Sequence, residues 1–313
     1  MIEIKRYKPE DREIWNELMT RSKIDTFLFN RNFMDYHSDL FYDHSFLIYK
    51  KGKVEAILPG NSANEIYYSH QGLTYGGLVS SINMTMTDVL NTFQLVNEEI
   101  KKDGIKKVIY KPVPTIYHLI PSQEDIYALY QLGATKIGCN ISSTIFLNNK
   151  IPFTESRKSG IRKAKKNNIS IEESCDFEGF WQILEDNLMN TYNKKPVHSL
   201  DEIQHLKNNF PENIKLFTAV YENCIVGGSV LFIMKNIIHV QYISANEFGK
   251  QNGALDLLFD ILINKLFTNY NIFDFGQSTE QMGRYLNNGL IFQKEGFGGR
   301  GIVYEIYEYN INI

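Results

Sequence analysis

The residues of this chain that could do chemistry stand where expected strands end. Asp274 lies within an apolar, strand-like run, and Gln277 and Ser278 follow where the chain leaves that strand. Tyr242 stands near the end of another expected strand, Ile237–Ser244. Loops at strand ends line sites more often than other surface segments do. A carboxylate, an amide and two hydroxyls in these places predict a site for proton transfer and hydrogen bonding.

A second candidate site is the connection from the strand of Tyr242 to an apolar helix expected over 254–267. The connection contains four consecutive candidates for binding an anion, Lys250, Gln251, Asn252 and Gly253. Unpaired N–H groups and the dipole at a helix N-terminus favour negative charge. The segment therefore predicts a phosphate-binding turn. The alternative is a glycine-containing turn that only introduces a core helix.

A basic helix is expected from about Ser156 to Lys166. Lys158, Arg162 and either Lys165 or Lys166 have the spacing i, i+4 and i+7 or i+8, so they share one face. One interpretation of this face is simple solvation. The functional interpretation is an anion site for a nucleotide-sugar diphosphate, for CoA or for an RNA backbone.

Further polar candidates occur in both halves of the chain. In the first half, Arg31, Tyr36 and His37 belong to a polar and aromatic cluster at helical spacing. His70 stands at the end of an expected strand, where a hydrogen-bonded structural role is the alternative to a functional one. The second half adds three polar residues near its end, Arg284, Tyr285 and Lys294.

Composition and spacing exclude several classes of protein. None of the seven histidines has an HExxH or similar spacing, so no metal is expected. The three cysteines are widely spaced, which is neither a disulfide framework nor a metal-ligand pattern. No apolar run reaches the ~18 residues of a membrane span and the first residues lack a secretion signal, so a cytoplasmic location is expected. A net charge of −3 argues against a protein devoted to nucleic acid.

A pattern that occurs twice predicts the domain organisation. Tyr49 and Tyr221 each follow an apolar run and precede a polar turn, and they stand 172 positions apart. Val54 and Val226, which follow the two turns, have the same separation. A chain of 313 residues also exceeds the size at which one core usually stops growing. We therefore expect two similarly folded domains, residues 1–150 and 151–313, with a cleft between them.

The two halves predict one order of elements: helix, helix, three antiparallel strands, helix, strand, short helix, strand. The first half is expected to end with a strand at Ser143–Leu147, and the second with a strand at Ile302–Tyr307. The strand–helix–strand step in each half implies one parallel crossover within a mixed sheet. The predicted fold class is α/β, with mixed α+β sheets in two tandem domains.

This order resembles the acyl-CoA N-acyltransferase fold of the GNAT superfamily. Phe273–Ser278, which reads FDFGQS, and Phe292–Gly298 resemble the FDFG-type signature of tandem-GNAT proteins. That group includes Fem-type peptidoglycan-bridge aminoacyltransferases and related acetyltransferases. The basic helix is similar to the helix that opens their second domain, and Ser69–Gly77 resembles a loop of members associated with surface-polysaccharide assembly. Residues 192–216 are too few for the helical arm that some Fem-type ligases carry.

The resemblance implies an N-acyltransferase that uses acetyl-CoA or another acyl-CoA and needs no metal. Its acceptor would be an amine on a sugar or other cell-envelope precursor in a bacterium. Asp274 would be the general base, Tyr242 would protonate the leaving thiolate or position the substrate, and Ser278 would complete the catalytic group. Residues 250–253 would hold the cofactor pyrophosphate, although Leu255 stands where the family has Gly or Ala. The remaining candidates would contact substrate: Arg31, Tyr36, His37, His70, Lys158, Arg162, Gln277, Arg284 and Lys294.

Two alternatives stay open at this point. The basic helix favours a tRNA-dependent aminoacyltransferase of the Fem type, which builds peptidoglycan bridges from charged tRNA. The imperfect phosphate turn favours a non-catalytic protein whose cleft binds a glycan or a peptide.

Overall fold

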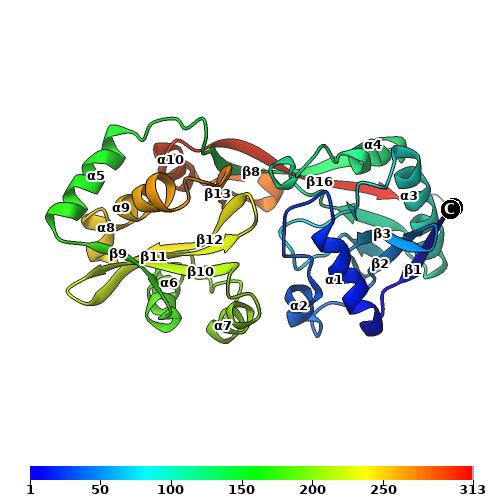
Figure 1. Cartoon of the computed structure of the whole chain (residues 1–313), viewed down its shortest axis with the longest axis horizontal. Coiled ribbons are helices and arrows are strands. Elements are labelled where there is room, and N and C mark those ends of the chain that lie inside the picture. The colour runs from blue at the N-terminus through cyan, green and yellow to red at the C-terminus, as the bar shows by residue number, and fades with distance from the viewer. Residues whose placement is uncertain (312–313) are drawn as a thin grey trace. The chain divides into compact units, whose positions relative to one another are not determined.

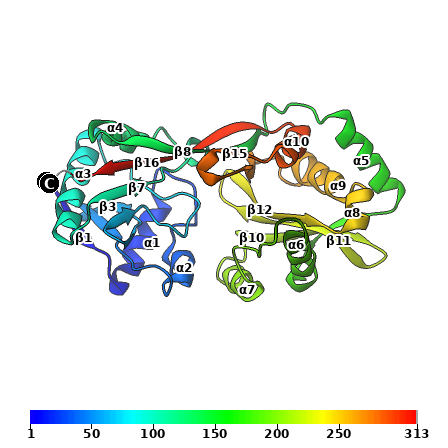
Figure 2. The same cartoon turned by 180° about the vertical axis from the view of Figure 1, so that it is seen from behind.

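The computed structural model describes residues 1–311, apart from the side chains of His37 and Tyr192. The chain forms two compact units (Figures 1 and 2). The first unit comprises residues 1–141, residues 279–285 and the chain from Ile302 onward. The second unit comprises residues 142–278 and 286–301.

Two groups of paired strands build the first unit. One has the order β1–β2–β3–β6 and is antiparallel throughout. In the other, β4 pairs with β5, β5 with β7 and β7 with the end of β16; only the β5–β7 pair is parallel. The bounds are β1 (Ile2–Arg6), β2 (Phe46–Lys50), β3 (Lys53–Leu58), β4 (Asn61–Ala63), β5 (Ile66–Tyr68), β6 (Val79–Ser80), β7 (Lys107–Tyr110) and β16 (Arg300–Asn310).

Helices cover both sides of the first unit's strands (Figure 1). They are α1 (Arg12–Thr20), α2 (Arg31–Met34), α3 (Met86–Lys102) and α4 (Glu124–Gln131), with short 3₁₀ turns at Pro9–Asp11, Asp35–His37 and Thr115–Tyr117. The sequence explains the bounds of α3. Thr85 and Asp88 form a capping box at its start, and Lys101 and Lys102 occupy the last turn, where positive charge is favourable.

The second unit contains one sheet with the order β9–β10–β11–β12–β13–β8. Every neighbouring pair in it is antiparallel except β12 and β13, which are parallel. This confirms the parallel crossover that the sequence predicts. The bounds are β8 (Thr135–Phe146), β9 (Ser170–Ser174), β10 (Ile214–Tyr221), β11 (Cys224–Ile233), β12 (Ile237–Ala245) and β13 (Ile272–Gln277).

Helices α6 and α7 cover one face of this sheet, and α5, α9 and α10 cover the other (Figures 1 and 2). A small β14–β15 ribbon with a 3₁₀ turn at Gln281–Gly283 lies between β13 and α10 in the chain, and a π-helical turn at Leu262–Leu266 extends α9. The bounds are α5 (Glu155–Lys166), α6 (Phe177–Tyr192), α7 (Leu200–Asn209), α8 (Glu247–Gln251), α9 (Ala254–Ile261), β14 (Thr279–Glu280), β15 (Tyr285–Leu286) and α10 (Asn288–Gly296).

The hairpins β2–β3 and β10–β11 are the repeated element seen in the sequence. Lys50 pairs with Lys53 across the first turn, and Tyr221 pairs with Cys224 across the second. Equivalent positions are therefore 171 residues apart, which corrects the expected separation of 172 by one residue. Both hairpins also carry a register shift at the same distance from their turns. The correction matters because a shift of one residue turns each side chain to the other face of the sheet.

The final strand of each half pairs in the unit built mainly from the other half. Residues 142–146 of β8 pair with β13 of the second unit, and residues 307–310 of β16 pair with β7 of the first. Strands do form near the expected Ser143–Leu147 and Ile302–Tyr307, within β8 and β16, but each extends into the other unit. Local patterns cannot show the exchange, because either apolar strand would fit either sheet edge.

Candidate active site

Strands β12 and β13 part within the sheet of the second unit. Their parallel register covers only Ile237–His239 and Ile272–Asp274. Beyond it, β12 continues along β11, whereas β13 shifts register along β8. Gly276 permits this departure, because its φ of +73° is a conformation that residues with a side chain rarely adopt. We call the point of separation, between His239 on β12 and Gly276 on β13, the strand fork.

Asp274 lies beside the strand fork and is fully buried. Its Oδ1 accepts hydrogen bonds from Ser142 Oγ at 2.5 Å, from Thr144 Oγ1 at 2.9 Å and from the backbone N–H of Gly276 at 3.3 Å. Its Oδ2 lies 2.9 Å from Nδ1 of His239. These donors stabilise the ionised carboxylate against the cost of burial. The carboxylate is thus enclosed by its own partners.

His239 is the partner that the sequence analysis missed. It stands opposite Asp274 in the last parallel pair of β12 and β13. An ionised carboxylate only accepts hydrogen bonds, so Nδ1 of His239 donates its proton and Nε2 carries the lone pair. A Cβ placed on Gly276 would lie 3.3 Å from Cε1 and 3.8 Å from Nε2, so the outer edge of the ring lies against the turn at Gly276. The signal that could have found it is the register of the two strands, because 35 residues separate the pair in sequence.

Lys294 from α10 holds the turn that follows β13. Its Nζ donates to the carbonyl oxygens of Gly276 and Gln277, both at 2.8 Å. Its side chain is buried, and this burial lowers its pKa from 10.5 to about 8, against the opposing effect of Asp274. The sequence candidates Asp274, Gln277 and Lys294 are therefore brought together at the strand fork.

Ser278 contributes a buried hydroxyl that has no hydrogen-bond partner. The residue is 1% exposed, and its Oγ makes no hydrogen bond, whereas its backbone carbonyl accepts from the N–H of Asn287 at 2.9 Å. Burying an unpaired hydroxyl costs about 1–3 kcal/mol. A ligand atom bound beside Ser278 would recover that free energy.

Tyr242 is held by a second residue that the sequence analysis missed, His198. The hydroxyl accepts from the backbone N–H of His198 at 3.1 Å and lies 2.5 Å from Nδ1 of its ring. Its ring packs edge-on against Trp181 at 5.0 Å. Burial raises the pKa of Tyr242 to about 12, so the hydroxyl keeps its proton at neutral pH. These contacts tie β12 to α6 and to the loop before α7.

The expected phosphate-binding turn is tied down by side chains of the second unit. Lys250 Nζ donates to Oδ1 of Asn187 at 2.7 Å and pairs with Glu247 at 2.9 Å. The remaining contacts link the turn to α5 and its C-terminal end: the carbonyl of Gln251 accepts from Lys163, and Asn252 accepts from Asn167.

Helix α5 packs across the first turn of α9. A Cβ placed on Gly253 would lie 2.3 Å from the carbonyl oxygen of Gly160, so two glycines allow the close approach. Arg157 on α5 pairs with Asp256 in the first turn of α9 at 2.7 Å. The N-terminus of α9, where the sequence predicts a phosphate, is therefore in contact with a helix of the same unit.

The basic helix α5 buries Ile161 and Ala164 and exposes its cations. Arg162 pairs with Glu155 at 2.6 Å. Lys158 is exposed on the same helix and lines a cavity of about 340 Å³ with Lys150, Phe153 and Asp260 among its other residues. The exposed cations of α5 are Lys158, Arg162, Lys163, Lys165 and Lys166.

The first unit has a corresponding fork between β5 and β7. Its last parallel pair is Tyr68 and Ile109, just as His239 and Asp274 are the last parallel pair of β12 and β13. Tyr68 and His239 are 171 residues apart, which is the separation found for the two hairpins. The chain itself fills the space beyond this pair. The N–H of Gly76 donates to the carbonyl of Lys111 at 2.8 Å, and a Cβ on Gly76 would lie 1.6 Å from a backbone oxygen of the same loop.

His70 and Lys111 belong to the segments that fill the space beyond the fork of the first unit. His70 is buried with a φ of +66°, and its ring lies 5.6 Å from that of Phe41. Lys111 Nζ donates to the carbonyl oxygens of Gln71 and Leu73. Burial lowers the pKa of Lys111 to about 8.

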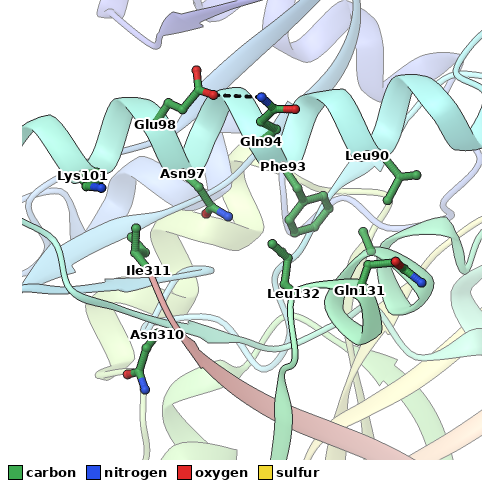
Figure 3. Close-up of a pocket in the computed structure, with 11 residues that line it drawn as sticks. Leu90, Phe93, Gln94, Asn97, Glu98, Lys101, Gln131, Leu132, Asn310 and Ile311 are labelled. Atoms are coloured by element: carbon green, nitrogen blue, oxygen red, sulfur yellow. Dashed lines mark hydrogen bonds between the residues drawn. The ribbon is translucent and has the colours of Figure 1, made fainter. Parts of the chain in front are cut away.

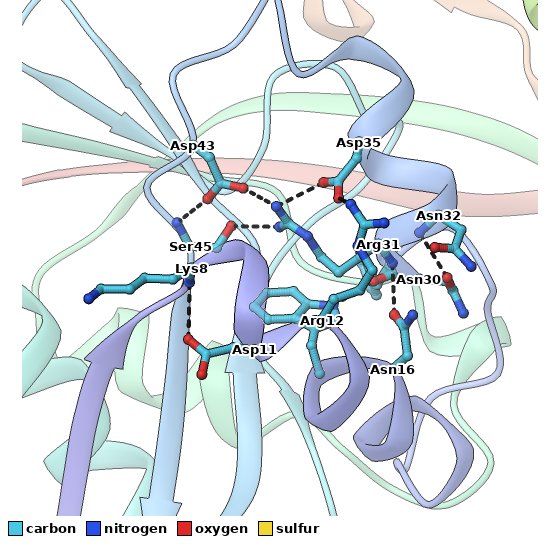
Figure 4. Close-up of polar contacts among 12 residues, drawn as sticks. Lys8, Asp11, Arg12, Asn16, Asn30, Arg31, Asn32, Asp35, Asp43 and Ser45 are labelled. Carbon is cyan, nitrogen blue, oxygen red and sulfur yellow. Dashed lines mark hydrogen bonds and ion pairs between the residues drawn. The ribbon is translucent and has the colours of Figure 1, made fainter.

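Arg31 is the buried centre of a polar cluster in the first unit (Figure 4). It pairs with Asp35 at 2.8 Å and with Asp43, and its guanidinium lies 3.6 Å from the ring centre of Tyr7. Asp35 also pairs with Arg12 at 3.0 Å. The other candidates from this part of the sequence lie in the 3₁₀ turn Asp35–His37; Tyr36 packs against Phe33, and the side chain of His37 lies outside the described part of the chain.

Two remaining features of the first unit lie apart from its fork. Arg284 and Tyr285 are exposed residues next to the 3₁₀ turn Gln281–Gly283. A cavity of about 450 Å³ lies between α3, α4 and the end of β16 (Figure 3). Its lining includes Phe93, Leu132 and Ile311, with a hydrogen bond between Gln94 and Glu98 at its rim.

Two features are absent from residues 1–311. No three His, Cys, Asp or Glu side chains in the described chain are grouped so that they could hold a metal ion. No helix in that part of the chain has the length and apolar character needed to cross a membrane.

Comparison with known proteins identifies the fold. No protein-family model and no curated protein matches this chain in sequence. Among solved structures, FemX matches with a TM-score of 0.70 at 10% identity, over 98% of this chain and 97% of that one. The C-terminal domain of a putative lysylphosphatidylglycerol synthetase from Agrobacterium fabrum matches with a TM-score of 0.63 at 12% identity, over 97% and 92%. A tandem GNAT protein from the clavulanic acid biosynthesis pathway matches with a TM-score of 0.55 at 9% identity, over 100% and 99%.

These likenesses span nearly the whole chain and show its fold. The chain has the tandem-GNAT fold shared with Fem-type proteins, which confirms the resemblance and the fold class predicted from the sequence.

Proposed function

We propose that this protein is an acyltransferase that moves an acyl group from an activated ester or thioester to an amine. The observation that supports this most is the strand fork of the second unit. There, β12 and β13 part beside the pair of Asp274 and His239, and the buried hydroxyl of Ser278 has no partner. An extended donor arm could add to the edge of β12 beyond His239 as an extra strand does.

The second unit is the better candidate for holding the donor. In the first unit, Tyr68 and Ile109 occupy the positions of the histidine and the aspartate. The loop around Gly76 also fills the space beyond that pair with backbone hydrogen bonds. We therefore assign the donor to the second unit.

The chemistry requires a neutral amine, a polarised carbonyl and a route for one proton. The amine nitrogen attacks the acyl carbon, a C–N bond forms, and the C–S or C–O bond to the leaving group breaks. The nitrogen loses one proton, and the leaving thiolate or alkoxide gains one. A donor such as Ser278 Oγ would stabilise the negative charge that develops on the carbonyl oxygen.

Acetyl-CoA is the donor we propose first, with an amine of a sugar or cell-envelope precursor as acceptor, in the cytoplasm of a bacterium. The sequence signature and the fold shared with a tandem GNAT protein support this choice. Lys250 is the proposed contact for the donor's phosphates. Its present partner Glu247 is highly exposed, and an exposed pair of this kind is worth at most about 1 kcal/mol, so a phosphate could replace it.

Charged tRNA is a second candidate donor, favoured by one specific observation. Helix α5 packs on the first turn of α9 and directs its cations to solvent. This arrangement covers the helix end that would hold a pyrophosphate, and it offers exposed cations to an RNA backbone. An aminoacyl ester needs no pyrophosphate at α9, and the likeness to FemX is consistent with such a donor.

One experiment separates the two donors. The protein is titrated calorimetrically with acetyl-CoA, and its binding of charged tRNA is measured at increasing salt. A tRNA donor predicts binding that weakens steeply with salt and is lost in Lys158→Glu/Arg162→Glu, because phosphate contacts release counterions. Lys265→Glu is the matched control, since this exposed lysine of the second unit lies outside α5.

The acetyl-CoA proposal predicts saturable binding of acetyl-CoA that both charge-reversal variants retain. Incubation with acetyl-CoA and glucosamine should then yield N-acetylglucosamine in a mass spectrum. Absence of acetyl-CoA binding, of salt-sensitive tRNA binding and of any acyl product would refute the acyltransferase proposal and favour a glycan- or peptide-binding protein.

A further inference from the structure

The pair of His239 and Asp274 is built as a positioned base. Asp274 is fully buried, and three donors besides the imidazole hold its carboxylate: two hydroxyls of β8 and the N–H of Gly276. The carboxylate accepts from Nδ1 of His239 at 2.9 Å. Its charge therefore fixes the Nδ1–H tautomer and stabilises the imidazolium that forms when Nε2 takes a proton.

The ring has its basic nitrogen directed to the strand fork. Nε2 lies on the side of the ring away from Asp274 and near the turn at Gly276. Glycine suits that turn because its φ is positive, and a Cβ there would lie only 3.3 Å from Cε1 of the imidazole. The FDFG segment thus supplies both the carboxylate and the room for the histidine.

The pair belongs to one unit only. At the matching positions of the first unit, Tyr68 stands for the histidine and Ile109 for the aspartate. The first fork is also filled by its own loop, whereas the second fork carries the unpaired hydroxyl of Ser278. If the fold needed an imidazole–carboxylate pair for its stability, both units would carry one.

We infer that His239 is the general base of acyl transfer and that Asp274 is its positioning residue, an inference that rests on the acyltransferase function proposed above. Nε2 takes a proton from the amine nitrogen as the C–N bond forms. The C–S or C–O bond of the donor then breaks, and the imidazolium gives the proton to the leaving sulfur or oxygen. No oxidant, reductant or metal enters this balance.

Two charged groups lie at the strand fork, Asp274 on β13 and Lys294 from α10. Asp274 favours the imidazolium, and the ammonium of Lys294, bound to the carbonyl of Gly276, opposes it. On β11 the ring faces Phe232, which carries no charge.

The first test needs no substrate. In protein with ¹⁵N-labelled histidine, the ring nitrogen shifts report the tautomer of each imidazole, and His239→Asn identifies the signal of His239. At pH 8, the inference predicts the Nδ1–H tautomer for His239. An Nε2–H tautomer would overturn it, because the nitrogen at the fork could then accept no proton.

The second test compares two substitutions under acyl transfer from acetyl-CoA to glucosamine, or from charged tRNA if that donor binds. Asn keeps a donor near the position of Nδ1, and Gln places its amide near the position of Nε2, but neither is a base. Both His239→Asn and His239→Gln should lower kcat by about 10²–10⁴-fold. In wild type, kcat should rise with pH by more than deprotonation of the acceptor amine explains, and both variants should lose this additional rise. KM for the donor should stay within about threefold.

The control is His205→Gln, since this exposed histidine of α7 lies outside the fork. Full activity of His239→Asn, with the wild-type pH profile, would assign the pair a structural role and overturn the inference. A wild-type protein without any acyl transfer would instead count against the proposed function. The tautomer measurement keeps the two failures distinguishable.

Discussion

Burial of Lys294 should make the stability of the second unit rise with pH. Its pKa is about 8 in the folded protein, against 10.5 for an exposed lysine, because burial disfavours the ammonium. Between these two pH values the unfolded chain binds a proton that the folded chain has lost. The free energy of unfolding therefore increases as pH rises through this window.

The size of the effect follows from the difference in pKa. The full shift corresponds to about 3 kcal/mol, of which about 2 kcal/mol is gained between pH 7 and pH 9.5. Buried tyrosines such as Tyr110 have a raised pKa and act in the opposite direction only above about pH 10, so this window avoids them.

The assay is urea unfolding at several pH values, with wild type, Lys294→Met and the exposed-lysine control Lys265→Met. Wild type and control should gain stability toward pH 9.5, and Lys294→Met should lose about 2 kcal/mol of that gain. Lys111→Met should remove a similar gain from the first unit, in its own transition if the units unfold separately. An unchanged pH slope in Lys294→Met would refute the assignment of a buried ammonium to this site.

Three further substitutions test other parts of the structure by their effect on unfolding free energy. Arg31→Met should cost about 1.5–3 kcal/mol in the first unit, because it removes the charged hydrogen bonds that the buried guanidinium makes to Asp35 and Asp43. Tyr242→Phe should cost about 1–2 kcal/mol through the lost contact with His198, and a stability equal to wild type would contradict the described contact. Gly253→Ala should cost at least about 2 kcal/mol, because its φ is +72° and the new Cβ would meet the carbonyl of Gly160; circular dichroism during urea unfolding measures all three.

Most of the order of elements was predictable from the sequence because it depends on local signals, although the predicted order lacks β9 and α7. The hairpin turn at Lys51–Gly52, for example, lies between two apolar runs, and the structure has β2 and β3 on its two sides. Thr85 and Asp88 carry the capping box that begins α3. Such signals act within a few residues, so they survive whatever the distant parts of the chain do.

Strand pairing could not be predicted in the same way. Nothing in residues 142–146 distinguishes an edge beside β7 from an edge beside β13, and the structure uses the latter. The separation of the repeat was also misjudged by one residue, since Tyr49 and Tyr221 look alike but differ by one position in their hairpins. Chemical likeness in sequence does not determine register, which depends on turns and bulges.

The candidate site was predictable only in part. Asp274, Gln277 and Ser278 were found because they belong to the recognisable segment Phe273–Ser278. The structure places Lys294, the fourth candidate, in contact with that segment. His239 was missed because its partnership depends on the parallel register of two strands.

Amide hydrogen exchange tests the central claim most directly, because it locates the bound donor without any substitution. Exchange is measured with and without the donor that binds, acetyl-CoA or charged tRNA, and is resolved along the chain. A donor arm that pairs with β12 and satisfies Ser278 should slow exchange in residues 240–246 and 276–279. Protection confined to residues 66–78 of the first unit would contradict it, as would donor binding with no protection at the strand fork.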